Sequence, residues 1–126
     1  MNVRVPFAAS SVGLVRQRLR GWMTAQHLPA ERVEEAQVVL SELVGNAVRH
    51  ARPLADGTLQ ISWCLDGGRL RLSVTDGGSA GRPHTVHASP SAVSGRGMVI
   101  VDSLAQSWWV DRSGRRTTVH ALLALG

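Results

Sequence analysis

The sequence predicts an α+β fold with a single domain, in which helices and a sheet form a two-layer sandwich. Its 126 residues, 44% of them hydrophobic, suit one compact domain over residues 1–126. Hydrophobic residues recur at helical spacing in some segments and alternate with polar residues in others. The helical segments and the pairs of alternating segments are largely segregated along the chain, which is typical of an α+β sandwich.

The first half of the chain predicts a strand followed by two helices. Asn2–Phe7 alternates valines with polar residues, as a short strand does. Val12–His27 has hydrophobic residues at helical spacing and is closed by Pro29. Ala30–Ala51 is the strongest helical pattern, with glutamates near its start, basic residues near its end, and Pro53 to stop it.

The second half predicts four strands and a third helix. Thr58–Leu65 and Arg69–Thr75 alternate on either side of an Asp-Gly-Gly turn, which indicates a hairpin with one polar face. Gly97–Gln106 returns to helical spacing. Trp108–Asp111 and Thr117–Leu125 are then expected to be the last two strands, joined by an arginine-rich turn.

Composition excludes several classes of protein. The 14 basic residues are all arginine, so the lysines required by a P-loop and by the protein-kinase fold are absent. A single cysteine, Cys64, excludes an intrachain disulfide. No hydrophobic run approaches the roughly 20 residues of a membrane helix, and no signal peptide is evident, so we expect a cytoplasmic protein with no membrane contact. The net charge of +5 is spread along the chain without an aromatic platform, and nucleic-acid binding is not expected.

A polar face on the Ala30–Ala51 helix is the first candidate site. Glu42, Asn46 and Arg49 stand at i, i+4 and i+7, within an arc of about 60°. Every amphipathic helix has a polar face, but Gly45 and Asn46 both weaken a helix, which favours a ligand-binding role. An amide oxygen and a carboxylate suit Mg²⁺, an arginine suits phosphate, and a carboxylate beside a triphosphate can deprotonate a hydroxyl.

Two glycine-containing segments follow the helix. One strand runs directly into Asp76-Gly77-Gly78, where the carboxylate can accept a hydrogen bond from an exocyclic amine such as that of adenine. The glycines would let a flat ligand approach the backbone, although Asp-Gly is equally typical of a plain hairpin turn. Ser94–Gly97 opens the third helix, whose N-terminal N–H groups favour anions, or it is a flexible loop before an ordinary cap.

Taken in this order, the three segments resemble the GHKL (Bergerat-fold) ATP-binding family, in the branch of small anti-sigma-factor serine/threonine kinases. Glu42–Ala51 is similar to the family's N box, Asp76–Gly78 to its first glycine box and Gly95–Val101 to its second. Thr118 resembles the strand threonine found near the adenine. The resemblance covers essentially the whole chain, and it implies a mixed, mostly antiparallel sheet covered by helices on one face.

The resemblance also implies ATP and Mg²⁺ as cofactors and a role for each matching residue. Glu42 would be the general base that activates a substrate hydroxyl, and Asn46 would hold Mg²⁺. Asp76 would receive the adenine amino group, with Thr118 helping through water. The other expected nucleotide contacts are Arg49, His50, Gly78, Gly95, Arg96, Gly97 and Met98.

These roles predict an anti-sigma-factor kinase that phosphorylates a STAS-type antagonist protein, binds a sigma factor and forms a homodimer. The alternative is a nucleotide-dependent partner-switching module without kinase activity. That alternative stays open because Ala80 stands where the first glycine box usually has its second glycine, with Gly81 one residue late, and the lid Ser79–Ser94 is short. A histidine-kinase fragment is disfavoured because no phosphoacceptor helix pair precedes the domain.

Overall fold

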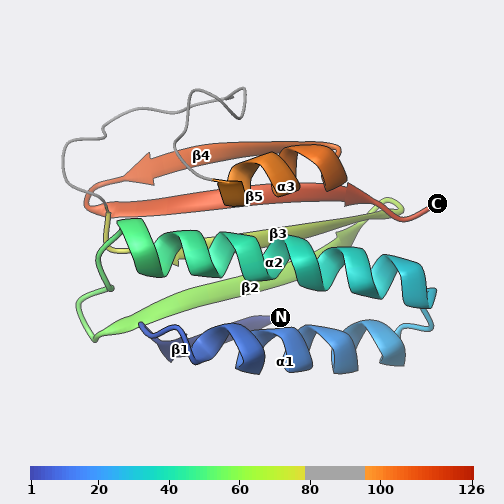
Figure 1. Cartoon of the computed structure of the whole chain (residues 1–126), viewed down its shortest axis with the longest axis horizontal. Coiled ribbons are helices and arrows are strands. Elements are labelled where there is room, and N and C mark those ends of the chain that lie inside the picture. Colours follow the sequence, from blue (N-terminus) through green and yellow to red (C-terminus); the bar gives the residue numbers. More distant parts are fainter. Residues whose placement is uncertain (79–95) are drawn as a thin grey trace.

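The computed structural model describes residues 1–78 and 96–126, which form three helices and one five-stranded sheet (Figure 1). The elements in chain order are β1 (Asn2–Pro6), α1 (Ser11–Ala25), α2 (Ala30–His50), β2 (Thr58–Asp66), β3 (Arg69–Asp76), α3 (Arg96–Leu104), β4 (Ser107–Ser113) and β5 (Arg116–Ala124). This order confirms the predicted succession of helices and strands, with ends that differ from the predicted ones by at most two residues.

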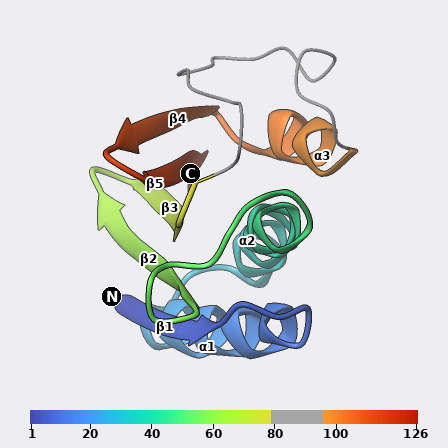
Figure 2. The ribbon, with the colours of Figure 1, turned by 90° about the vertical axis from the view of Figure 1, so that its left-hand side faces the viewer.

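The sheet has the strand order β1-β2-β3-β5-β4, and all pairings between its strands are antiparallel. The expectation of a mixed sheet is therefore wrong for the described strands. The reason is that β5 lies between β3 and β4, so these two strands run in the same direction without touching. Helices α1, α2 and α3 all cover one face, which confirms the two-layer α+β sandwich (Figure 2).

The core lies between this sheet and the three helices, with α2 packed between α1 and α3. The face of α2 centred on Leu40 is buried, as its spacing predicts. Across from it, the sheet contributes the alternating side chains Leu70, Leu72 and Val74 of β3. No helix within the described ranges is long and apolar enough to cross a membrane.

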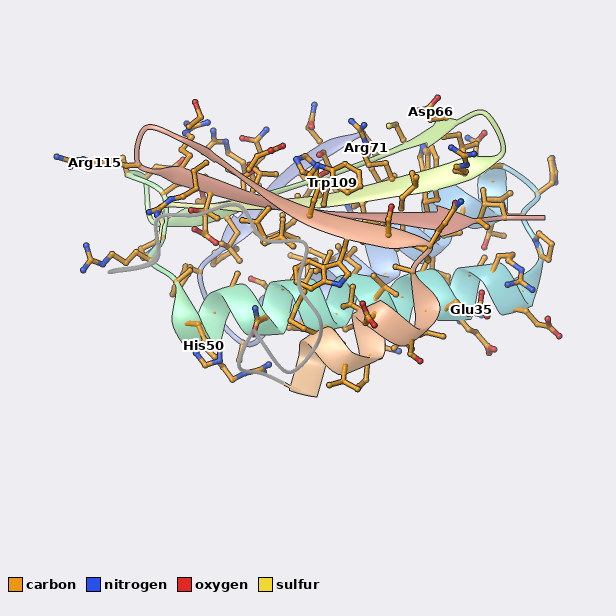
Figure 3. The ribbon with its side chains drawn as sticks, turned by 90° about the horizontal axis from the view of Figure 1, so that it is seen from above. Glu35, His50, Asp66, Arg71, Trp109 and Arg115 are labelled. Carbon is orange, nitrogen blue, oxygen red and sulfur yellow. The ribbon has the colours of Figure 1, made fainter. Side chains whose placement is uncertain are left out.

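Polar side chains occupy the opposite face of the sheet, which the helices leave uncovered (Figure 3). The Ser73 hydroxyl lies 2.7 Å from His120 Nδ1, and His120 Nε2 lies 3.0 Å from an Asp111 carboxylate oxygen. Trp109 stacks on the His120 ring at 5.0 Å, and the Arg71 guanidinium lies over Trp109. Burial lowers the pKa of His120 against the opposing effect of Asp111. Through Ser73 and Asp111 this histidine links three neighbouring strands.

Candidate functional site

The candidate site is built first on the second half of α2. The helix forms because hydrophobic residues recur on its core face, and Glu31 in its first turn and Arg49 and His50 in its last turn favour the helix dipole. Glu42 and Asn46 are half-buried, and Arg49 is exposed near the helix end. The polar face predicted on this helix is therefore partly buried at Glu42 and Asn46 and exposed to solvent at Arg49.

Asn46 has the most informative environment on this face. Its Oδ1 atom is buried and has no hydrogen-bond partner among the described residues. In this part of the chain, the other buried side-chain polar atom without a partner is the donor Trp63 Nε1. A buried polar atom without a partner costs about 1–3 kcal/mol, so native proteins rarely keep one without a reason. A bare amide oxygen is a ligand that Mg²⁺ accepts. The side chain therefore fits the predicted metal-binding role, because a bound cation would satisfy the oxygen.

Arg49 explains the glycine that precedes Asn46. The Arg49 Nη1 atom lies 3.2 Å from the point where a Cβ on Gly45 would stand. What approaches the backbone at Gly45 is therefore a side chain from the next turn of the same helix. The Arg49 guanidinium thus lies back along α2, beside the backbone at Gly45. His50, the last residue of α2, is exposed, and its predicted nucleotide contact remains a prediction.

Asp76 is the second part of the site. It is the last residue of β3 and continues the helix-facing row of Leu70, Leu72 and Val74, which leaves its side chain only 4% exposed. The Gly78 N–H donates to Asp76 Oδ1 at 2.7 Å. Burial raises the pKa of Asp76 to about 6, against the opposing effects of the Gly78 N–H and the Arg112 charge. A carboxyl group buried at a strand end has two acceptor oxygens, and the second one, Oδ2, is the candidate acceptor for a ligand.

Gly77 and Gly78 are required by the protein itself. The two glycines do not join a hairpin, because the next element along the chain is α3, and the next strand, β4, pairs with β5 and not with β3. A Cβ on Gly77 would stand 2.0 Å from the Pro53 carbonyl oxygen, and one on Gly78 would stand 2.5 Å from the Arg115 carbonyl oxygen. The Cβ positions of both glycines thus face the chain's own backbone. The predicted approach of a flat ligand at these glycines, and the contact of Gly78 with the nucleotide, remain predictions.

The same segment ties the end of α2 to the end of β3. The Arg52 N–H donates to the Gly78 carbonyl at 2.9 Å, and the Gly77 N–H donates to the Arg52 carbonyl at 2.8 Å. These paired bonds fix Asp76 relative to the helix that carries Asn46. Two parts of the site that are far apart in sequence are therefore held by backbone contacts rather than by side chains.

Gly77→Ala is expected to destabilise the fold strongly, because the new methyl group would overlap the Pro53 carbonyl. Pro53 follows directly after Arg52, whose N–H and carbonyl are held by the paired hydrogen bonds. We expect a loss of about 2–4 kcal/mol and a melting temperature lower by roughly 10 °C or more. Thermal denaturation followed by circular dichroism measures the change. Gly21→Ala in α1 is the matched control, since open space surrounds that glycine, and it should be neutral or stabilising. Equal melting temperatures for the two variants would contradict the close packing of the Gly77 backbone against Pro53.

The strand threonine predicted to help hold the adenine is on the wrong face. Thr118 pairs with Thr75, and their hydroxyls lie 2.8 Å apart on the face of the sheet away from the helices. The Thr118 hypothesis is therefore wrong. Asp76 is instead paired with Thr117, which is paired in turn with Arg112 on β4. The alternation of Val119, Ala121 and Leu123 along β5 could have identified Thr117 from the sequence, because residues two apart share a face.

The predicted second glycine box lies only partly within the described residues. Gly95 lies outside them, as do Ala80, Gly81 and the lid Ser79–Ser94, and residues 96 and 97 are described only as the start of α3. Met98 is 2% exposed and belongs to the hydrophobic core. Its side chain therefore packs the fold, and only its backbone N–H in the first turn of α3 is left to meet a nucleotide.

Residues 5–122 match the model of the histidine kinase-like ATPase domain, and the chain belongs to this family. The match includes α2, the Asp76 segment and α3, the elements that carry the site. Comparison with curated protein sequences gives no match.

Three solved bacterial structures share this fold. The structure of the RsbU and RsbW domains of Rv1364c from Mycobacterium tuberculosis matches 99% of this chain with a TM-score of 0.75 and 20% identity, and the match spans 31% of that longer protein. The SiaB–SiaC complex from Pseudomonas aeruginosa matches 98% with a TM-score of 0.72 and 12% identity, over 88% of the compared chain. The histidine kinase domain of the blue-light activated kinase from Erythrobacter litoralis EL346 matches 96% at 0.56 and 19% identity, over 62% of that chain.

Proposed function

We propose that this protein binds ATP with Mg²⁺ and acts as a serine/threonine kinase of the anti-sigma-factor type, with a STAS-type antagonist protein as its substrate. The observation that carries the proposal is the buried Asn46 Oδ1, which has no hydrogen-bond partner among the described residues and lies on the helix that also presents Glu42 and Arg49. An unsatisfied oxygen of this kind is costly in a purely structural helix and useful in a cation site.

The residues of the chain divide the work between two ends of the site. Asp76 accepts a hydrogen bond from the amino group of the base through Oδ2, whereas its Oδ1 accepts the hydrogen bond from the Gly78 N–H. Asn46 would hold Mg²⁺, which would supply positive charge to offset the charge of the phosphates. Arg49, whose guanidinium lies beside Gly45, adds a positive charge to the same phosphates. Glu42, one helical turn before Asn46, takes the proton of the substrate hydroxyl.

The STAS-type partner is proposed from the fold and from the carboxylate of Glu42 on α2. A site that only senses ATP does not need a base, whereas transfer to a hydroxyl does. One similar solved structure is a complex between two proteins, SiaB and SiaC, which supports partner binding by chains of this fold. From the family resemblance we also propose that the protein binds a sigma factor and that it does so as a homodimer.

Phosphoryl transfer to candidate partners tests the proposal. The protein is incubated with ATP labelled on its γ-phosphate, Mg²⁺ and the STAS-type proteins encoded in the same genome, alongside Asn46→Ala. We expect label on a serine or threonine of one partner, and none with Asn46→Ala. ATP-dependent binding of a partner without transfer would favour the partner-switching module, which the Ala80 departure keeps open. Unchanged ATP affinity in Asn46→Ala would contradict the site itself.

A further inference from the structure

Arg112 reaches the candidate site from a strand that does not touch β3. It pairs with Thr117 of β5, and Thr117 pairs with Asp76, so the three side chains form one row across three strands. The row lies on the helix-facing side, because Trp108 of β4 and Val74 of β3 belong to that face and are buried. The Arg112 Nη2 atom is 4.0 Å from the point where a Cβ on Gly78 would stand. The guanidinium therefore extends over β5 to the segment that follows Asp76.

The groups around Asp76 single out this arginine as its charged neighbour. By the register of the sheet, β2 places Leu59 beside Asp76 and β5 places Thr117 there, and neither of these side chains titrates. On the side of α2, Ala47 is buried, and Arg52 meets the Asp76 segment through its backbone while its side chain is exposed. Within the described residues, Arg112 is the cation that favours the ionised form of Asp76.

We propose that Arg112 is a positioning residue of the nucleotide site, which keeps the Asp76 carboxylate ionised and directed toward the exocyclic amino group of the base. The inference rests on the proposed ATP-binding function. An ionised carboxylate accepts a hydrogen bond more strongly than a protonated one, and burial alone would favour the protonated form. The Gly78 N–H supplies part of the opposing effect, and Arg112 supplies the rest from across β5.

Measuring ATP affinity against pH tests the role of Arg112. Wild-type affinity should fall as the pH drops through about 6, where Asp76 takes up a proton. In Arg112→Gln this fall should begin at higher pH, so that affinity at pH 7 drops roughly 3- to 10-fold and recovers by about pH 8.5. Arg112→Lys should restore most of the wild-type profile. Arg116→Gln, on the same hairpin with an exposed side chain, is the control and should match the wild type.

A second measurement without nucleotide separates this role from a packing role. The Asp76 carboxyl carbon is titrated by NMR in the wild type and in Arg112→Gln, and we expect a higher midpoint in the variant. Identical midpoints and superimposable affinity profiles would overturn the proposal, as would an equal loss of affinity at every pH. Failure of the underlying function looks different, because ATP would then fail to bind the wild type or would bind equally well after Asp76→Asn.

Discussion

Replacing Asp76 by asparagine is expected to weaken ATP binding by at least about 100-fold, while stabilising the protein in the absence of nucleotide. The two effects have one origin, which is the buried carboxyl at the end of β3. In the variant, the amide oxygen of the new side chain can keep the hydrogen bond from the Gly78 N–H. The amide NH₂ group then occupies the place of the free carboxylate oxygen, and it presents donors to the amino group of the base instead of an acceptor.

The stability effect has a defined dependence on pH. Asp76 has a pKa of about 6 in the folded chain, against an ordinary value of 3.8. Between these values the folded state holds a proton that the unfolded state has lost, so stability falls as the pH rises through this window. The full cost, about 3 kcal/mol, is present above pH 6 and absent well below pH 4. Removing the carboxyl should therefore raise the melting temperature by roughly 5–10 °C at pH 7.5 and leave it unchanged at pH 3.5.

Calorimetry with ATP and thermal denaturation across pH measure both effects on the same preparations. Asp66→Asn is the control, because it makes the same change at an exposed turn between β2 and β3. It should bind ATP like the wild type and show no such rise in melting temperature. A variant at Asp76 that binds ATP normally would exclude the adenine role. One that loses binding and is also less stable at pH 7.5 would make Asp76 a structural residue.

The parts of the site that follow from local pattern could be predicted from the sequence. The 3.6-residue period places Asn46 on α2, and the alternation of β3 carries Asp76 onto the helix-facing side. The burial of Asn46 Oδ1 could not be predicted, because it depends on the packing of α2 within the folded domain. Helical spacing alone describes Glu42 and Asn46 as a polar face, and the tertiary structure shows that the face is partly enclosed.

The errors have a common physical cause, which is contact between segments far apart in sequence. A shift of one residue along a strand moves a side chain to the other face, and this is why Thr117, and not the predicted Thr118, shares a face with Asp76. The prediction of a mixed sheet is wrong because the local spacing of hydrophobic residues does not determine the order of strands. In the structure, β5 separates β3 from β4. For the same reason the sequence could not place Arg112 at Gly78 or the Pro53 carbonyl at Gly77.

Replacing Glu42 by glutamine is expected to reduce phosphoryl transfer by about 10²- to 10⁴-fold while ATP affinity stays within a factor of two or three of the wild type. Glutamine keeps the length and shape of the side chain but cannot take up the hydroxyl proton. Glu42 is half-buried on α2 and makes no ion pair or hydrogen bond within the part of the chain that the structure describes. Its replacement should therefore leave the melting temperature nearly unchanged, so that a loss of transfer reports on chemistry.

Single-turnover transfer from labelled ATP to the STAS-type partner measures the effect, with ATP affinity measured separately by calorimetry. Glu34→Gln is the matched control, because it makes the same change two turns earlier on α2, at an exposed position. It should transfer phosphate at the wild-type rate. Transfer that persists after Glu42→Gln would remove this residue from the base role and assign proton removal to another group or to water. Loss of ATP affinity in parallel with transfer would instead assign Glu42 to nucleotide binding, because a general base acts on the transition state and not on the bound ground state.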